Sequence, residues 1–364
     1  MDPSVMRILS DAAGNRPPTK QECRHLLSFP ETSLESGVMM ASADHVSRER
    51  FGNNAILLGQ IGIETAPCSG RCKFCAFGNG HALFQEERLS MQQILDRAHA
   101  FSGQGDLYAL FLMTMQGSDF ARLLTVVSSV RRLIPPQTRI VVNTGDLDGG
   151  QGDELRSAGV NGAYHIRRLR EGIDTDIPPA RRLRTIELIK KAGLDLYYCC
   201  EPIGPEHTAE ELVEQVFIGI EFGCFQHAAM RRICVPGTPL FSAGQITERR
   251  LAQIVAVVTL ATLGCKETGN IAVHEPNLLG LCAGANAIYA ETGSNPRDTA
   301  ADTRGNRGMD MNGCRIMIRE AGFTGLLSGD KVLPLSSRVS DGGSPDPFLK
   351  SPEPSGNISG ALDD

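Results

Sequence analysis

The chain has 364 residues, of which 41% are hydrophobic and 21% are charged, and its formal net charge is −6. These proportions are typical of a folded globular protein that is large enough to bury a sizeable core. The negative charge disfavours a nucleic-acid partner, because proteins that follow a phosphate backbone are normally basic.

Residues 1–50 show loose helical periodicity and are expected to form an N-terminal helical extension. The first fourteen residues lack the charged start and the apolar run of a secretory signal. No apolar stretch of the chain reaches the length of a membrane span. The sequence therefore predicts a cytoplasmic protein with no membrane contact.

Residues 51–330 alternate short apolar runs with longer amphipathic stretches. The predicted strands are Ile56–Ile63, Leu107–Met113, Arg139–Asn143, Gly162–Ile166, Leu194–Cys199, Met230–Val235, Asn270–His274 and Ala287–Tyr289. The predicted helices between them include Ser90–Ser102, Phe120–Leu133, Ala180–Ala192, Ala209–Phe222 and Thr247–Leu263.

Glycines follow several of these helices directly, at Gly159, Gly193 and Gly264, where a left-handed C-terminal cap suits glycine. The repeated strand–loop–helix unit predicts an α/β fold with a parallel sheet. Eight such strands indicate a closed (β/α)8 barrel of the TIM type, and a doubly wound open sheet is the alternative.

Residues 335–364 are dominated by Ser, Pro, Gly and Asp and are expected to form a disordered C-terminal tail. Pairs of adjacent arginines are scattered through the preceding barrel region and are mostly expected to lie on solvated faces. They are Arg131-Arg132, Arg167-Arg168, Arg181-Arg182, Arg231-Arg232 and Arg249-Arg250.

Three cysteines, Cys68, Cys72 and Cys75, follow the first predicted strand with the spacing C-x3-C-x2-C. Thiolates so close together on a glycine-containing loop can converge on one metal centre, and thiolates are the usual ligands of iron–sulfur clusters. Three ligands leave one coordination position open, as a catalytic centre requires, whereas a structural zinc site uses four. The alternatives are a zinc site completed by His81 and three unrelated cysteines.

This loop, with Phe74 before the last cysteine and its place after the first barrel strand, resembles the signature of the radical S-adenosylmethionine (SAM) superfamily. Later segments, Val235–Leu240, Cys282–Tyr289 and Gly293–Pro296, are similar to the biotin synthase, methylornithine synthase and [FeFe]-hydrogenase maturase branch. The resemblance implies a [4Fe-4S] cluster on the three cysteines. It also implies reductive cleavage of SAM to methionine and a 5′-deoxyadenosyl radical that abstracts hydrogen from a substrate.

The resemblance also implies residues that contact the cofactor and the substrate. Phe74 is expected to cover the cluster, and an Arg after the fourth strand to bind the SAM carboxylate. Strand ends are expected to supply the other contacts, since active sites of such barrels lie at the carboxyl ends of their strands. The expected cofactor-binding residues are Phe74, Gln116, Arg167, Arg168, Glu201 and Ile203. The expected substrate-contacting catalytic residues are His274 and Glu275, and a structural hydrogen bond between these two is the alternative.

The sequence departs from biotin synthase at the auxiliary cluster that donates sulfur in that enzyme. The second and third strands carry no cysteine, and the seventh offers His274 where biotin synthase has an arginine. The eight cysteines outside the loop are mostly expected to be buried apolar residues. An auxiliary cluster is the alternative, with Cys199, Cys200, Cys234 and Cys282 nearest to predicted strands.

The expected function is therefore hydrogen abstraction from a small-molecule substrate in cofactor or amino-acid biosynthesis. A reductant such as flavodoxin or ferredoxin would supply the electron. Sulfur insertion of the biotin or lipoyl kind and a non-enzymatic iron–sulfur scaffold are the alternatives.

Overall fold

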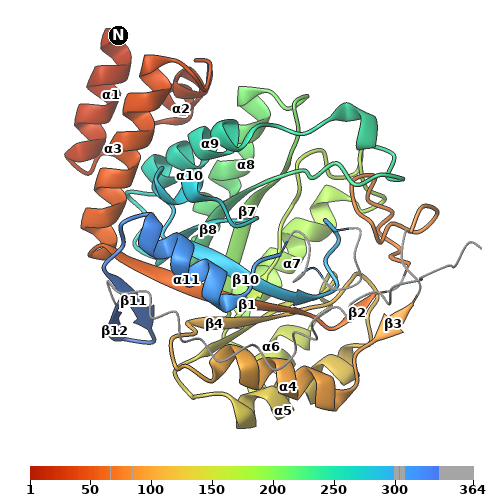
Figure 1. Cartoon of the computed structure of the whole chain (residues 1–364). Coiled ribbons are helices and arrows are strands. Elements are labelled where there is room, and N and C mark those ends of the chain that lie inside the picture. The colour runs from red at the N-terminus through yellow and green to blue at the C-terminus, as the bar shows by residue number, and fades with distance from the viewer. Residues whose placement is uncertain (66, 83–85, 299–302, 304–307, 336–364) are drawn as a thin grey trace, which may run out of the picture.

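The computed structural model describes residues 1–335 except 66, 83–85, 299–302 and 304–307. Three helices come first, α1 (Pro3–Ala13), α2 (Lys20–Leu27) and α3 (Leu34–Phe51). Each begins at a polar residue, Asp2, Thr19 or Ser33, whose side chain accepts hydrogen bonds from first-turn N–H groups. The three helices lie at one side of the molecule, where α3 packs along α9 (Figure 1).

A closed barrel of eight parallel strands forms the centre of the described part of the chain. The strands are β1 (Asn54–Gly62), β4 (Ala109–Met113), β5 (Arg139–Asn143), β6 (Gly162–Tyr164), β7 (Asp195–Ile203), β8 (Gln226–Arg231), β9 (Asn270–Val273) and β10 (Ala287–Gly293). They pair in chain order, and β10 returns to β1 with Ile56 opposite Ala287. The closure confirms the predicted TIM-type barrel and excludes the open doubly wound sheet.

Helices cover the outside of the barrel (Figure 1). They are α4 (Met91–Ser102), α5 (Phe120–Leu133), α6 (Gln151–Ser157), α7 (Pro179–Lys191), α8 (Ala209–Glu221), α9 (Glu248–Ala261), α10 (Leu278–Leu281) and α11 (Met311–Glu320), with a 3-10 turn at Phe241–Ala243. Every residue of α9 from 251 to 261 is buried, because α2, α3 and α10 cover the side that faces away from the barrel.

The sixth barrel strand, β8, covers Gln226–Arg231, so it begins and ends about four residues before the predicted range Met230–Val235. Its first residues are polar but buried: Gln226 donates to the Tyr289 hydroxyl, and His227 Nε2 lies 2.9 Å from the Val216 carbonyl. The apolar residues Ile233 and Val235 instead pack on the loop that carries the three cysteines. The predicted range was wrong because these two apolar residues are buried between two loops and are not part of the sheet.

Two small antiparallel strand pairings were not predicted. Strand β2 (Glu64–Thr65) pairs with β3 (Glu87–Arg88), and β11 (Gly325–Ser328) pairs with β12 (Lys331–Pro334). Strand β11 also pairs with the start of β1, so this hairpin lies at the amino-terminal end of the barrel. The expected disordered tail, residues 335–364, lies outside the described residues apart from its first residue. Among the described helices, none is long and apolar enough to cross a membrane.

Aromatic side chains close the barrel interior. Phe111 contacts the rings of Tyr164, Tyr197 and Tyr289 edge-on, with centroids 5.0–6.4 Å apart. These rings come from β4, β6, β7 and β10, so they reach across the barrel axis from different sides. They form a floor, above which the carboxyl ends of the strands remain open to a cavity.

Candidate active site

A cavity of about 1230 Å³, counted with its open mouth, lies at the carboxyl ends of the barrel strands. The three cysteines line it, although they follow β1 while other lining residues come from β4 to β10. This is the end at which parallel-barrel enzymes place their chemistry.

Backbone hydrogen bonds shape the loop of residues 67–78, called the cysteine loop below. The Cys68 N–H donates to the Phe77 carbonyl at 2.6 Å, and the Cys75 N–H donates to the Cys72 carbonyl at 3.1 Å. The Phe77 N–H points at Cys75 Sγ, 3.4 Å away. N–H groups directed at sulfur are among the features that tune iron–sulfur clusters.

Gly70 lies between two of the thiols. A Cβ atom at this position would be 3.6 Å from Sγ of both Cys68 and Cys72 and 3.0 Å from the Ile177 side chain. Within the described residues, no three His, Cys, Asp or Glu side chains already converge on a single metal ion. The donor set nevertheless fits an iron–sulfur cluster, since three thiols of one loop face one cavity and a glycine keeps the space between two of them open.

Burial raises the pKa of the Cys72 thiol to about 11 and that of the Cys75 thiol further. Both groups are therefore protonated at neutral pH when no metal is present, and metal binding would release their protons. His81, the ligand of the zinc alternative, directs Nε2 at the Cys75 carbonyl oxygen, 3.0 Å away, and does not line the cavity.

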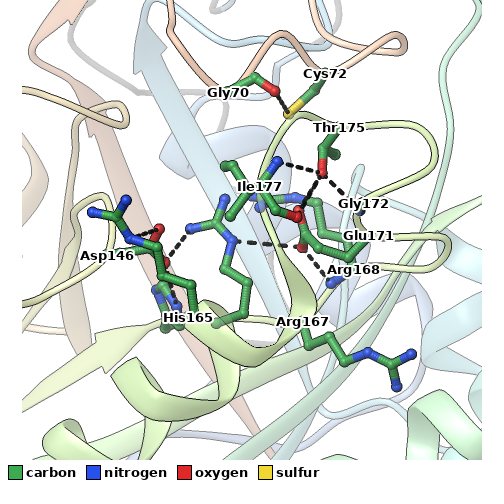
Figure 2. A network of polar contacts seen from close by, with 12 residues as sticks. Gly70, Cys72, Asp146, His165, Arg167, Arg168, Glu171, Gly172, Thr175 and Ile177 are labelled. Atoms are coloured by element: carbon green, nitrogen blue, oxygen red, sulfur yellow. Dashed lines mark hydrogen bonds and ion pairs between the residues drawn. The ribbon is translucent and has the colours of Figure 1, made fainter.

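The segment that follows β6 braces the cysteine loop. The Asp176 N–H donates to the Gly70 carbonyl at 2.9 Å, the Lys73 N–H donates to the Asp174 carbonyl at 2.9 Å, and Lys73 Nζ donates to the Ile173 carbonyl at 2.7 Å. Thr175 stands at the centre of this segment and donates to Glu171 at 2.7 Å (Figure 2). Three backbone-directed contacts thus hold the loop between Cys68 and Cys75.

Glu171 connects residues 173–176, which hold the cysteine loop, to a buried network of charged side chains (Figure 2). Arg182 lies 3.5 Å from Glu171 and 2.9 Å from Asp146, whose side chain is fully buried. Asp146 also lies 3.1 Å from Arg181 and 3.5 Å from His165. Burial lowers the pKa of His165 to about 4, so its ring is neutral at physiological pH.

A second charged pair crosses the cavity wall. Arg168 Nε lies 3.2 Å from Glu201 Oε1, and the Tyr164 hydroxyl donates to Glu201 Oε2 at 2.9 Å. The Tyr164 hydrogen bond therefore fixes the position of Glu201, which is the acidic partner of Arg168. Gln116, in the loop after β4, accepts the Asp146 N–H with its Oε1 at 2.9 Å.

Most of the residues predicted for the site line this cavity: Cys68, Cys72, Cys75, Phe74, Gln116, Arg168, Glu201 and His274. Three others do not. Arg167 points away from the charged network (Figure 2), and its carbonyl accepts the Tyr198 hydroxyl. Ile203 packs between the barrel and its helices, and Glu275 pairs with Arg231 at 2.8 Å.

Sequence reasoning missed several arginines of the cavity wall. Arg182, Arg231 and Arg232 are at most 8% exposed, so the prediction that the arginine pairs mostly lie on solvated faces was wrong for these members. Arg297 was also missed, and it pairs with Glu291 at 2.6 Å. The sequence contained one indication of this position, because Asn295 is a typical turn residue. Its side-chain oxygen accepts the Arg297 N–H at 2.9 Å, and this turn positions Arg297.

The remaining cysteines do not gather at the cavity. Cys199 belongs to the aromatic interior of the barrel, whereas Cys200, on the opposite face of β7, lies under α8 near the Leu212 carbonyl. Cys234 is partly exposed, and Cys282 is exposed at the end of α10. Cys199 and Cys200 are adjacent on β7, and adjacent residues of a strand point to opposite faces, so only Cys199 faces the barrel interior.

Comparisons with known proteins point to one group of enzymes, although no family model matches the chain. The chain is 25% identical over 229 residues to biotin synthase of Clostridioides difficile, covering 60% of this chain and 69% of the relative. It is 26% identical over 300 residues to biotin synthase of a Nocardioides species, covering 78% of this chain and 76% of the relative.

Solved structures share the fold. Methylornithine synthase (PylB) superposes with a TM-score of 0.75 at 17% identity, over 87% of this chain and 96% of that one. The [FeFe]-hydrogenase maturase HydG from Carboxydothermus hydrogenoformans superposes with a TM-score of 0.68 at 18% identity, over 88% and 78%.

Proposed function

We propose that this chain, a radical SAM superfamily protein of the biotin synthase branch, holds a [4Fe-4S] cluster on Cys68, Cys72 and Cys75. The observation that carries the proposal is that these three thiols of one braced loop line a single cavity at the carboxyl ends of a closed barrel. When bound, the cluster supplies one electron that cleaves SAM to methionine and a 5′-deoxyadenosyl radical, which abstracts hydrogen from a small substrate.

Arg168 is our candidate for holding the SAM carboxylate, because its guanidinium faces the cavity and is oriented by Glu201. Gln116 and Glu201 offer further hydrogen-bonding oxygens toward SAM, and Phe74 excludes water beside the thiols. Arg167 and Ile203 are outside this contact set. Arg168 is thus favoured over Arg167 as the anchor that the sequence predicted.

His274 is our candidate for contacting the substrate directly. In this proposal Glu275 positions Arg231, because its carboxylate pairs with that arginine. Arg231 lines the cavity, and Glu275 does not. The electron would come from a reductant such as flavodoxin or ferredoxin, in the cytoplasm. The substrate is a small molecule, since the site is a cavity inside a barrel rather than an open groove.

Sulfur insertion is less well supported than hydrogen abstraction alone. It requires a sulfur source beside the substrate, and among the described strands β7 supplies a single inward thiol, Cys199. A scaffold protein would not need a cavity lined by charged pairs such as Arg168 and Glu201.

The test is anaerobic reconstitution with iron and sulfide, followed by chromatography of SAM cleavage products under dithionite. Wild-type protein should form 5′-deoxyadenosine and methionine, and the Cys68→Ala/Cys72→Ala/Cys75→Ala variant should form neither, because its thiolate ligands are gone. The exposed Cys282→Ser variant is the matched control and should behave as wild type. SAM cleavage by the triple variant would overturn the proposal.

A further inference from the structure

Gln60 is a polar residue on the inner face of β1. Along this strand Ile56 and Leu58 belong to the aromatic interior of the barrel, and residues two apart on a strand point to the same face. Gln60 therefore points inward as well, and it lines the cavity although the residue is only 3% exposed. Because β1 continues to Gly62 before the cysteine loop begins, Gln60 lies deeper in the barrel than that loop.

The side-chain amide of Gln60 forms no hydrogen bond with the described residues. Its neighbours on the paired strands are Phe111 on β4 and Glu291 on β10. Phe111 has no polar side-chain atom, and the Glu291 carboxylate already accepts from Asn295 at 2.7 Å and from Arg297 at 2.6 Å. The protein itself therefore does not use this amide, whereas most buried polar groups are hydrogen-bonded.

The amide of Gln60 is accessible from the cavity. Other polar atoms of the barrel have neither a partner nor accessible surface, among them both ring nitrogens of His274 and both amide atoms of Asn270. The amide atoms of Gln60 do not belong to this group, so they have accessible surface on the cavity that the residue lines. An accessible donor and acceptor in a cavity that is otherwise largely apolar indicate a contact for a ligand.

Gln60 lies across the barrel from the residues proposed to hold SAM. The strands follow one another in the order β1, β4, β5, β6, β7, β8, β9 and β10, so β7 is four strands from β1 in either direction. Glu201 is on β7, and Arg168 follows β6. A SAM molecule anchored by these two residues would leave the amide on β1 to the substrate.

A primary amide presents a donor and an acceptor on the same edge. In Gln60, one N–H of Nε2 and the oxygen Oε1 lie side by side, so one planar group with the complementary pair can bond both. Glutamine and asparagine amides pair with the edge of adenine in this way. A carboxylate would satisfy only the N–H, and an ammonium group only the oxygen. A carboxamide or a lactam satisfies both.

We infer that the substrate presents an uncharged amide edge, that of a carboxamide or a lactam, to Gln60. The inference rests on the proposed function, because it names the substrate class of the same cavity. The apolar part of such a substrate has Met113 and Met230 of the cavity lining to pack against. Gln60 is thus a specificity-determining residue.

The test uses hexanamide, hexanoate and hexylammonium, three probes of equal chain length, in equilibrium dialysis against reconstituted protein with SAM and without reductant. Gln60→Leu, which removes both polar atoms, should weaken hexanamide binding about ten-fold, which corresponds to about 1.4 kcal/mol. It should change the binding of either charged probe by less than about two-fold. Gln60→Met, with an unbranched apolar side chain of similar length, should give the same result.

The matched control is Gln226→Leu, because Gln226 is a buried glutamine of the same barrel that bonds to the Tyr289 hydroxyl and does not line the cavity. This change should leave hexanamide binding as in wild type and lower the urea midpoint of unfolding. Gln60→Leu should leave the urea midpoint as in wild type, since no internal hydrogen bond is lost.

Equal weakening of all three probes by Gln60→Leu, unchanged hexanamide binding in that variant, or no binding of hexanamide to wild type would each overturn the inference. Iron content reports whether each variant is loaded. SAM cleavage by the wild-type preparation tests the proposed function separately, so failure of cleavage and failure of the amide contact are distinct results.

Discussion

The cysteine loop and the aromatic wall, which consists of the rings of Tyr164, His274 and Tyr289, are built differently, although the three cysteines, Tyr164 and His274 line the same cavity. Backbone hydrogen bonds from residues 173–176 hold the loop, and the charged groups behind it have oppositely charged partners at 2.9–3.5 Å. At the aromatic wall, both ring nitrogens of His274 lack partners among the described residues. The polar groups behind the loop are therefore paired within the protein, whereas the aromatic wall contains two buried ring nitrogens without a partner among the described residues.

The largest stability effect is expected behind the cysteine loop. Arg182→Ala should lower the free energy of unfolding by about 3 kcal/mol, because it leaves the buried Asp146 and Glu171 carboxylates without their shared partner. Arg181→Ala is the matched control, since Arg181 pairs with the same Asp146 but its side chain is 54% exposed, and it should cost about 1 kcal/mol or less. Urea unfolding measures both, and equal losses would contradict a buried support.

An intermediate effect should appear when the pH falls. Burial lowers the pKa of His165 to about 4 from an ordinary 6.5, so the unfolded chain binds a proton between these values that the folded chain does not. The free energy of unfolding should therefore fall with falling pH, by about 1 kcal/mol from His165 alone between about pH 7 and pH 5.5.

His165→Asn should remove that part of the pH dependence, because it cannot be protonated. His45→Gln, at an exposed histidine, should leave the dependence as in wild type. Urea unfolding at both pH values measures the difference. An identical slope in His165→Asn and wild type would show that His165 is not held neutral by burial.

The smallest effect is expected at the aromatic wall, and it has the opposite sign. His274→Phe should raise the free energy of unfolding by up to about 1 kcal/mol, because it removes two unpartnered nitrogens and keeps the ring contact with Tyr289. The matched control is His227→Phe, at another buried histidine whose Nε2 lies 2.9 Å from the Val216 carbonyl. That change should cost about 1–2 kcal/mol. If both variants were destabilised equally, the comparison between the two regions would fail.

The barrel could be predicted because its information is local. Apolar runs alternate with amphipathic helices, and glycine caps such as Gly193, with φ of 68°, mark where a helix ends before a strand. The cysteine loop could be predicted for the same reason, since the spacing of its three cysteines is contained in eight consecutive residues. The error at the sixth strand arose because the buried polar residues Gln226 and His227 look like a loop until their partners are known.

The surroundings of the site could not be read in the same way. The brace at the cysteine loop uses backbone carbonyls of Gly70, Ile173 and Asp174, which carry no side-chain signature. Arg182 lies inside a helix, next to the largely exposed Arg181, and only the fold shows which of the two turns inward. Whether a buried histidine has partners depends on the tertiary packing around it, and its residue type does not reveal this.

The most direct test of the account is the iron and sulfide content of reconstituted protein. Wild-type chain and Cys199→Ser should each hold about four irons and four sulfides, and the Cys68→Ala/Cys72→Ala/Cys75→Ala variant should hold almost none. Substantial iron and sulfide in the triple variant, lost when Cys199 is also replaced, would contradict a single cluster on the cysteine loop and would favour sulfur insertion.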